Sequence, residues 1–251
     1  MTDTVLACEG LIKRFGGIAA VDGVTLELRG GEIHALIGPN GAGKTTLLDL
    51  LSGELRPDRG RILLDGIEIT HLPPHRRARA GIARSFQITA VFASFSVRDH
   101  VMLALQARQR SSFRFFADAG REPGLSRRAW ELLARVGLGD EPDCGVERLS
   151  HGRKRQLELA MALAGEPRLL LLDEPLAGMS AEEGRAVVEL LAAERGRFAM
   201  LLVEHDMDAV FRLADRITVL DRGRVIASGP PAVVRADPEV MRAYLGDEEA
   251  G

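Results

Sequence analysis

The expected fold depends on the stretch Gly38-Pro39-Asn40-Gly41-Ala42-Gly43-Lys44-Thr45-Thr46. It fits the pattern G-x-x-x-x-G-K-[ST] of a phosphate-binding loop. The apolar run at residues 33–37 predicts a buried strand before the loop, and the run at 47–51 predicts a helix after it. The motif requires a strand, a glycine-rich loop and a helix in this order. A mere glycine turn with a stray lysine is therefore a poor alternative.

The residue types of this loop suit a triphosphate. Glycines allow backbone N–H groups to surround phosphate oxygens without interference from a Cβ atom. The positive end of the following helix dipole favours the same anion. We expect Lys44 to reach the β- and γ-phosphates and the hydroxyl of Thr45 to hold a Mg²⁺ ion.

The composition is that of an ordinary soluble globular protein. The 251 residues are 46% hydrophobic and 27% charged, enough for one large domain or two small ones. A net charge of −3 argues against a nucleic-acid-binding protein with a broad basic surface. Cys8 and Cys144 lack metal-ligand spacing and indicate a reducing cytosol. No leader and no apolar run of about 20 residues is seen, so we expect no membrane-spanning helix.

Strands are expected before and after the loop. Residues 4–37 look rich in strands, and apolar and polar side chains alternate over residues 24–28. Residues 61–69 predict a hairpin around an Asp-Gly turn. A second hairpin is expected over residues 216–227.

Two features of this region admit two interpretations each. Phe15 follows basic residues and precedes two glycines, so its ring either stacks on an adenine or packs in the core. A basic run predicts a solvated helix face. This run comprises Arg76, Arg77, Arg79 and Arg84.

Residues 88–160 have a different character and predict a mainly helical insertion. Ser96 with Asp99 resembles a capping box that opens a helix. Ser126 is expected to open another helix, with Gly137 as its stop. The aromatic segment 111–116 is either a loop, which we favour, or an exposed patch for a partner.

A pair of carboxylates follows the next predicted strand, residues 169–172. We expect this strand to lie beside the strand of residues 33–37, which would place Asp173 near the Mg²⁺ ion. Glu174 could then orient the water that attacks the γ-phosphate. An acidic pair at a helix N-terminus is the alternative for these two residues taken alone.

Three further positions could complete a nucleotide site. His205 follows the predicted strand 198–203 and could donate a hydrogen bond to the γ-phosphate, although a lone histidine is more often structural. Ser150 and Gly152 precede a long helix and predict a second anion site. Two copies of the chain could therefore complete each other's sites. Gln87 is placed to contact the metal or the water before the helical insertion.

Together these residues resemble the ATP-binding subunit of an ABC transporter over nearly the whole chain. The matching motifs are the A-loop aromatic (Phe15), Walker A (38–46), the Q-loop (Gln87), the signature (149–153), Walker B (169–173), the catalytic glutamate (Glu174), the D-loop (177–180) and the H-loop (His205). Three residues depart from the family's motifs. His151 and Arg153 do so in the signature, and Ser180 does so in the D-loop.

The resemblance implies an α/β fold with a RecA-like P-loop NTPase core. Residues 1–87 and 161–251 would together form this core, which includes an N-terminal antiparallel β subdomain. Residues 88–160 would be the helical subdomain. ATP and Mg²⁺ are the implied cofactors, with Thr45, Gln87 and Asp173 as metal ligands. Lys44, Gln87, Glu174 and His205 are the implied catalytic residues.

The implied partners are membrane permease subunits, a second ATPase subunit that is either the same chain or a paralogue, and, indirectly, an external substrate-binding protein. No nucleic acid is expected. The protein would act peripherally at the cytoplasmic face of the cell membrane. Residues 13–17, the aromatic insertion and the ending 241–246 resemble the branched-chain amino-acid importers.

Other functions remain open within and beyond this subgroup. Urea or amide importers and a lipopolysaccharide-export ATPase belong to the same subgroup. A soluble ABC protein acting on ribosomes, DNA or cluster assembly usually carries tandem domains or long basic inserts, which this chain lacks. A small-molecule kinase would not need the signature element.

Overall fold

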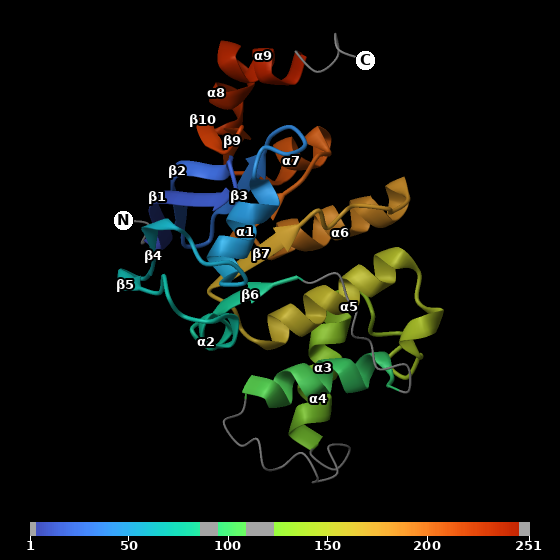
Figure 1. The fold of residues 1–251 in the computed structure, drawn as a ribbon. Coiled ribbons are helices and arrows are strands. Elements are labelled where there is room, and N and C mark those ends of the chain that lie inside the picture. The colour runs from blue at the N-terminus through green and yellow to red at the C-terminus, as the bar shows by residue number, and fades with distance from the viewer. Residues whose placement is uncertain (1–3, 86–94, 109–122, 246–251) are drawn as a thin grey trace. The chain divides into compact units, whose positions relative to one another are not determined.

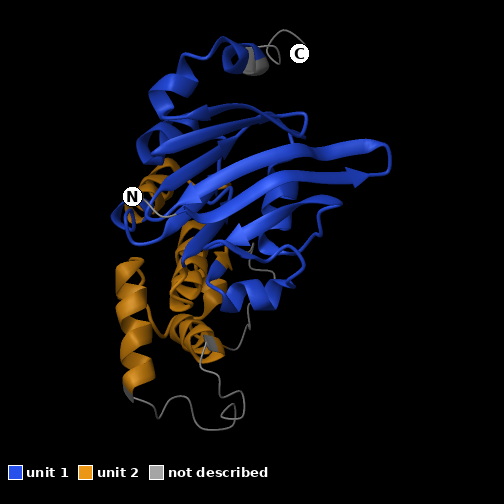
Figure 2. Ribbon diagram, turned by 90° about the vertical axis from the view of Figure 1, so that its left-hand side faces the viewer, with its two compact units in different colours: residues 1–82, 168–175, 191–251 blue, residues 83–167, 176–190 orange. Residues whose placement is uncertain are grey.

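The computed structural model describes residues 4–85, 95–108 and 123–245 (Figure 1). The predictions for Gln87 and for the segment 111–116 lie outside these residues. The chain forms two compact units, coloured separately in Figure 2. Unit 1 comprises Met1–Ile82, Arg168–Pro175 and Leu191–Gly251, and unit 2 comprises Ala83–Pro167 and Leu176–Leu190. Within the described ranges, no helix is long and apolar enough to cross a membrane.

Unit 1 contains an antiparallel sheet with the order β2-β1-β4-β5. Its strands are β1 (Thr4–Phe15), β2 (Ile18–Arg29), β4 (Arg59–Leu64) and β5 (Ile67–Glu68). Over residues 24–28 the apolar side chains are buried and the polar ones exposed, as predicted. The hairpin β4–β5 is also confirmed, with positive φ angles at Asp65 and Gly66 in its turn.

The second sheet has the order β10-β9-β3-β8-β7-β6. Its strands are β3 (Ile33–Ile37), β6 (Ile82–Arg84), β7 (Leu169–Asp173), β8 (Ala199–Val203), β9 (Arg216–Asp221) and β10 (Arg224–Gly229). The β9–β10 hairpin confirms the prediction for residues 216–227. The prediction that β7 lies beside β3 is wrong, because β8 pairs in parallel with both strands and lies between them.

Both faces of β3 are buried because β3 separates two apolar clusters. Leu36 packs with residues of α1 (Lys44–Ser52) and of the antiparallel sheet. Ala35 and Ile37 point to the other face, toward residues of α7, α8 and α9. These helices span Met207–Leu213, Pro231–Arg235 and Pro238–Leu245. Burial on both faces explains why this strand reads as one continuous apolar run.

The prediction of a solvated arginine face fails at Arg77. This residue lies on α2 (Pro74–Arg79) and is only 1% exposed. Its guanidinium donates hydrogen bonds to four backbone carbonyl groups, those of Leu50, Leu51, Thr70 and Leu72. Burial lowers the pKa of Arg77 to about 10. Arg84 lies on β6 rather than on this helix.

Unit 2 is built from helices α3 (Val97–Arg108), α4 (Pro123–Arg135) and α5 (His151–Ala164), which contact one another, and from residues 181–190 of α6 (Ala181–Ala193). A short 3₁₀ helix covers Val146–Arg148. The Ser96–Asp99 capping box is confirmed, since Ser96 N–H donates to the Asp99 carboxylate at 2.9 Å. The prediction that Ser126 opens a helix is wrong. Helix α4 begins at Pro123, a residue type well suited to a first helical turn.

Candidate functional site

The phosphate-loop residues connect β3 to α1 in a conformation that only glycine can adopt. Gly38 has φ 151° and Gly43 has φ 102°. A Cβ atom at either position would lie 2.1 Å from a backbone carbonyl oxygen, that of Leu220 or of Ala20. The loop is therefore packed tightly against neighbouring backbone. Close approach of the neighbouring backbone is one physical reason for glycine at these two positions.

Lys44 begins α1 and folds back over the loop. Its ammonium donates to the carbonyl oxygens of Gly38 at 2.7 Å and Pro39 at 3.0 Å. The residue is 6% exposed. Burial lowers the pKa of Lys44, and the negative charges of Glu174 and Asp173 partly oppose this shift. The structure therefore brings these carboxylates into the electrostatic environment of the loop lysine, although β7 is not adjacent to β3.

Helix α1 links the phosphate loop to the strand that carries the two carboxylates. It contacts β7, and Figure 1 shows it lying across the sheet that carries both strands. Asp173 is the last residue of β7, and Glu174 follows it with a positive φ of 47°. The N–H of Glu174 donates to the carbonyl of Val203 at 2.9 Å, which ties this turn to the end of β8. Both carboxylates thus lie at the carboxyl ends of parallel strands, where α/β proteins bind ligands.

His205 forms a pair that the sequence did not predict. Its Nε2 lies 2.9 Å from Oε1 of Glu174, and both side chains are more than 40% exposed. Glu204, which is buried, accepts a hydrogen bond from the N–H of His205 and holds this backbone in place. Glu174 and His205 are 31 residues apart, so only the pairing of β7 with β8 reveals the contact. A carboxylate next to an imidazole can accept a proton from water and retain its orientation.

The oxygen donors of Thr45 and Asp173 fit a Mg²⁺ ion. Magnesium prefers hydroxyl, carboxylate and phosphate oxygens and usually takes only one or two protein ligands in nucleotide sites. In the described part of the chain, no cluster of three or more carboxylate, histidine or cysteine side chains could hold a metal alone.

Phe15 lies at the end of β1 and is 50% exposed, so it is not a core residue. The ammonium of Lys13 lies 5.7 Å from the centroid of its ring. One face or edge of the ring is thus available to solvent. Of the two interpretations offered by the sequence, exposure favours the stacking surface.

The second predicted anion site lies in unit 2, at the start of α5. Ser150 is the N-cap of this helix, and its hydroxyl accepts a hydrogen bond from the N–H of Arg153 at 3.4 Å. The same hydroxyl donates to Oε1 of Glu183 at 2.7 Å, and the N–H of Gly152 donates to this oxygen at 3.3 Å. The predicted site thus contacts a carboxylate. The guanidinium of Arg153 lies 3.6 Å from the carboxylate of Glu141.

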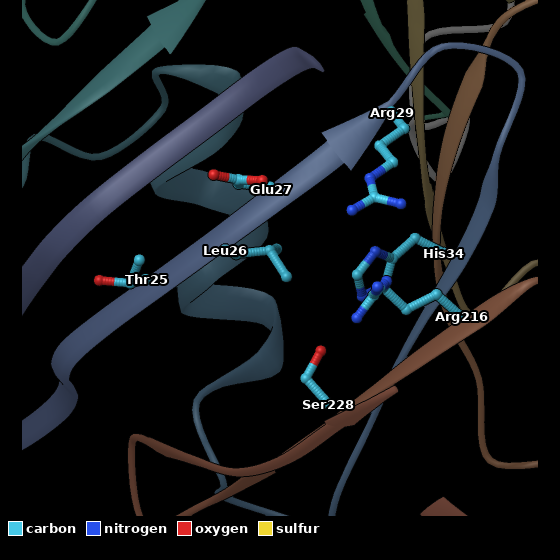
Figure 3. A pocket seen from close by; sticks show the side chains of 7 residues that line it. All are labelled: Thr25, Leu26, Glu27, Arg29, His34, Arg216 and Ser228. Carbon is cyan, nitrogen blue, oxygen red and sulfur yellow. The ribbon is translucent and has the colours of Figure 1, made fainter. Parts of the chain in front are cut away.

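A pocket in unit 1 is lined by residues of β2, β3, β9 and β10 (Figure 3). Its lining comprises Thr25, Leu26, Glu27, Arg29, His34, Arg216 and Ser228. His34 Nε2 is 2.8 Å from the hydroxyl of Thr218, which is itself 2.8 Å from the hydroxyl of Ser228. Because His34 is the second residue of β3, whereas the loop follows the last, this pocket is separate from the phosphate-loop site.

Comparisons with known proteins agree with this geometry. The family model described as "ABC transporter" matches residues 21–177, and the model "Branched-chain amino acid ATP-binding cassette transporter" matches residues 224–250. The structure is similar to that of the ADP conformation of MJ1267, an ATP-binding cassette of an ABC transporter. Its TM-score is 0.85 at 28% identity, with coverage of 97% of this chain and 99% of that chain.

Two curated relatives have the full length of this chain. The chain is 38% identical to the high-affinity branched-chain amino acid transport ATP-binding protein LivG of Salmonella typhimurium. It is 36% identical to BraF of Pseudomonas aeruginosa, which carries the same description. Each match covers 98% of this chain and 100% of the relative. The chain therefore belongs to the ATP-binding proteins of ABC transporters, in the branched-chain amino acid transport group.

Proposed function

We propose that this chain hydrolyses Mg-ATP to drive branched-chain amino acids through membrane permease subunits. The observation that carries the proposal is the phosphate loop between β3 and α1, together with Asp173 and Glu174 at the carboxyl end of β7, a strand that α1 contacts. A phosphate-binding lysine and a pair of carboxylates at strand ends are the parts that phosphoryl transfer to water requires. The names of the full-length relatives favour branched-chain amino acid transport over urea, amide or lipopolysaccharide transport.

The nucleotide would lie across the N-terminus of α1. Backbone N–H groups of residues 38–46 would surround its phosphates, and Lys44 would exchange its two carbonyl partners for phosphate oxygens. The exposed ring of Phe15 would stack on the adenine. Thr45, Asp173 and Gln87 would hold the Mg²⁺ ion, which when bound neutralises charge that develops on the phosphates.

Glu174 is the proposed general base. Its carboxylate would accept a proton as water attacks the γ-phosphorus and the bond from that phosphorus to the ADP oxygen breaks. His205 contacts Oε1 of Glu174 in the structure and would keep the carboxylate oriented toward the water. The other ring nitrogen of His205, Nδ1, could donate a hydrogen bond to the γ-phosphate, as the sequence predicted.

Ser150 and Gly152 are proposed to act on the nucleotide of a second ATPase subunit, either a copy of this chain or a paralogue. A serine hydroxyl and a backbone N–H at a helix N-terminus suit a γ-phosphate. Each chain in a symmetric pair would then complete the site of the other. The helical unit would engage permease subunits at the cytoplasmic face of the membrane, and an external binding protein would deliver the substrate.

The substitution Glu174→Gln tests the catalytic assignment. ATP affinity should be unchanged because the phosphate loop is intact, while kcat should fall by about 10²-fold or more because the proton acceptor is lost. The ATP-bound variant should accumulate as a dimer in size-exclusion chromatography. Glu54→Gln, an exposed carboxylate of the same unit, is the matched control and should retain wild-type kcat. A Glu174→Gln protein that hydrolyses ATP at the wild-type rate would exclude this role.

A further inference from the structure

Glu183 uses its two carboxylate oxygens for two different contacts within unit 2. Oε2 accepts hydrogen bonds from the N–H of Ser180 at 3.1 Å and from its hydroxyl at 3.0 Å. Oε1 accepts from the hydroxyl of Ser150 at 2.7 Å and from the N–H of Gly152 at 3.3 Å. One side chain therefore joins the start of α6 to the start of α5.

The contacts of Oε2 have an ordinary structural explanation. The N–H of Glu183 donates back to the hydroxyl of Ser180 at 3.3 Å, so the two residues form a capping box at the N-terminus of α6. A capping box needs only one carboxylate oxygen. The contacts of Oε1 with Ser150 and Gly152 are therefore not explained by the requirements of α6.

The packing at Gly152 is adapted to this carboxylate. A Cβ atom at Gly152 would lie 2.8 Å from Oε1 of Glu183 and 2.9 Å from its Cβ and Cδ atoms. Glycine at this position thus permits the approach of Glu183 as well as that of any other anion. The hydrogen bond from Ser150, followed by those from Ser180, lowers the pKa of Glu183 to about 2. The group is consequently a full negative charge at neutral pH.

We propose that Glu183 is a positioning residue of the ATP site, whose carboxylate holds Ser150 and Gly152 until a γ-phosphate displaces it. The proposal rests on the proposed function, in which these two residues bind the nucleotide of the second subunit. Two anions cannot share the same two donors, and a γ-phosphate next to Glu183 would also be repelled by it. Closure of the two ATPase subunits around ATP therefore includes the free-energy cost of moving the Glu183 carboxylate.

The capping box provides a route for this displacement. Oε2 can keep its hydrogen bonds with Ser180 while Oε1 turns away from Ser150, so α6 remains capped when the phosphate enters. Glu183 would then set the ATP concentration needed for closure of the two subunits. ATP shifts the equilibrium between the open and closed states only by the difference in its affinity for them. In the absence of ATP, Glu183 would favour the open state.

The test is the ATP dependence of hydrolysis by the assembled transporter carrying Glu183→Gln. The glutamine keeps the size of the side chain and can still cap α6, but it binds Ser150 and Gly152 without a charge. We expect the KM for ATP to fall about threefold to tenfold, the difference between a charge-assisted and a neutral hydrogen bond, with kcat nearly unchanged. Glu182→Gln removes the same charge from the neighbouring exposed residue and should leave the KM unchanged.

Two results would overturn the proposal. One is a KM for Glu183→Gln equal to or above that of the wild type. The other is an equal fall in KM for Glu182→Gln, which would indicate a general charge effect. A purely structural role predicts a lower Tm and a lower kcat without a fall in KM. Glu183→Ala, which also removes the cap, separates these effects because its KM should still fall although its Tm is lower.

Ser150→Ala distinguishes failure of this proposal from failure of the proposed function. If Ser150 binds the γ-phosphate, Ser150→Ala should lower kcat/KM. Adding Glu183→Gln to this variant should then lower the KM much less than it does in the wild type. If Ser150→Ala lowers kcat/KM but Glu183→Gln changes nothing, only the role of Glu183 is refuted. If Ser150→Ala is indistinguishable from the wild type, the proposed second anion site fails as well.

Discussion

Lys44 is buried beside the loop, and its proposed role also requires a positive charge for the phosphates. Burial lowers its pKa below the ordinary 10.5, and Glu174 and Asp173 only partly oppose this effect. The unfolded chain therefore binds the proton more tightly than the folded one. Stability due to Lys44 must rise as the pH increases from the lowered pKa to 10.5, and it is constant below that window.

The substitution Lys44→Met separates these demands. Affinity for ATP should fall by about 100-fold, because the charge proposed to contact the phosphates is removed. The free energy of unfolding should not fall, since the variant no longer buries an ammonium group. In the variant, the free energy of unfolding should no longer increase with pH between the lowered pKa of Lys44 and 10.5. Urea unfolding at several pH values measures this. An unchanged ATP affinity, or the same alkaline slope in both proteins, would contradict this account.

At the scale of residues, the sequence predicted identities better than contacts. The pattern around Lys44 and the position of Glu174 after a strand were sufficient to find both residues. The contact between Glu174 and His205 was not predictable, because it depends on the pairing of β7 with β8. The contact of Ser150 with Glu183 was not predictable either, because it joins the starts of two helices and 33 residues separate the two side chains. A Ser-x-x-Glu spacing at residues 180–183 was the available signal, and it indicates only a helix cap.

At the scale of elements, α1 depends on an arginine from another helix. The carbonyls of Leu50 and Leu51 near its C-terminus accept hydrogen bonds from Arg77 at 2.7 and 2.8 Å. The last carbonyls of a helix have no partners within the helix and need others when they are buried. This requirement explains why Arg77 is buried, although the local run of arginines predicted a solvated helix face.

Arg77→Leu should destabilise the protein by about 3 kcal/mol or more, because several buried carbonyl groups lose their donor together. Arg77→Lys should recover only part of this loss, since an ammonium group has three donors and lacks the planar shape of a guanidinium. Arg79→Leu on the exposed side of the same helix is the control and should have little effect. Chemical denaturation measures all three. Equal stability of the Arg77→Leu and Arg79→Leu variants would show that the carbonyls find other partners.

At the scale of the whole molecule, the sequence predicted the central buried strands but not their order, and it did not predict β6. Continuous apolar runs identified β3, β7 and β8 as buried strands. Nothing in those runs specified that β8 lies between the other two, because strand order is set by long connections and by packing of α1 and α7 on opposite faces. The error had little effect on the site. The carboxyl ends of parallel strands meet at one edge whatever their order.

The site proposed to be shared between two chains is also a property of whole molecules, and mixing inactive chains tests it. Lys44→Ala removes the loop lysine and Ser150→Ala the second anion site, so each variant alone should hydrolyse ATP poorly. A mixed dimer contains one site with both residues intact, contributed by different chains. With random pairing in an equal mixture, half of the dimers are mixed and half of their sites work, so activity should recover to about a quarter of wild type.

The matched control places both substitutions in one chain and mixes it equally with the wild type. Every mixed dimer then has two defective sites, and only wild-type dimers remain active, again about a quarter of the full activity. If each site were contained in a single chain, the control mixture would keep about half of the activity and the first mixture would gain none. A mixture of single variants that stays inactive while the wild type forms ATP-dependent dimers would therefore refute a site shared between two chains.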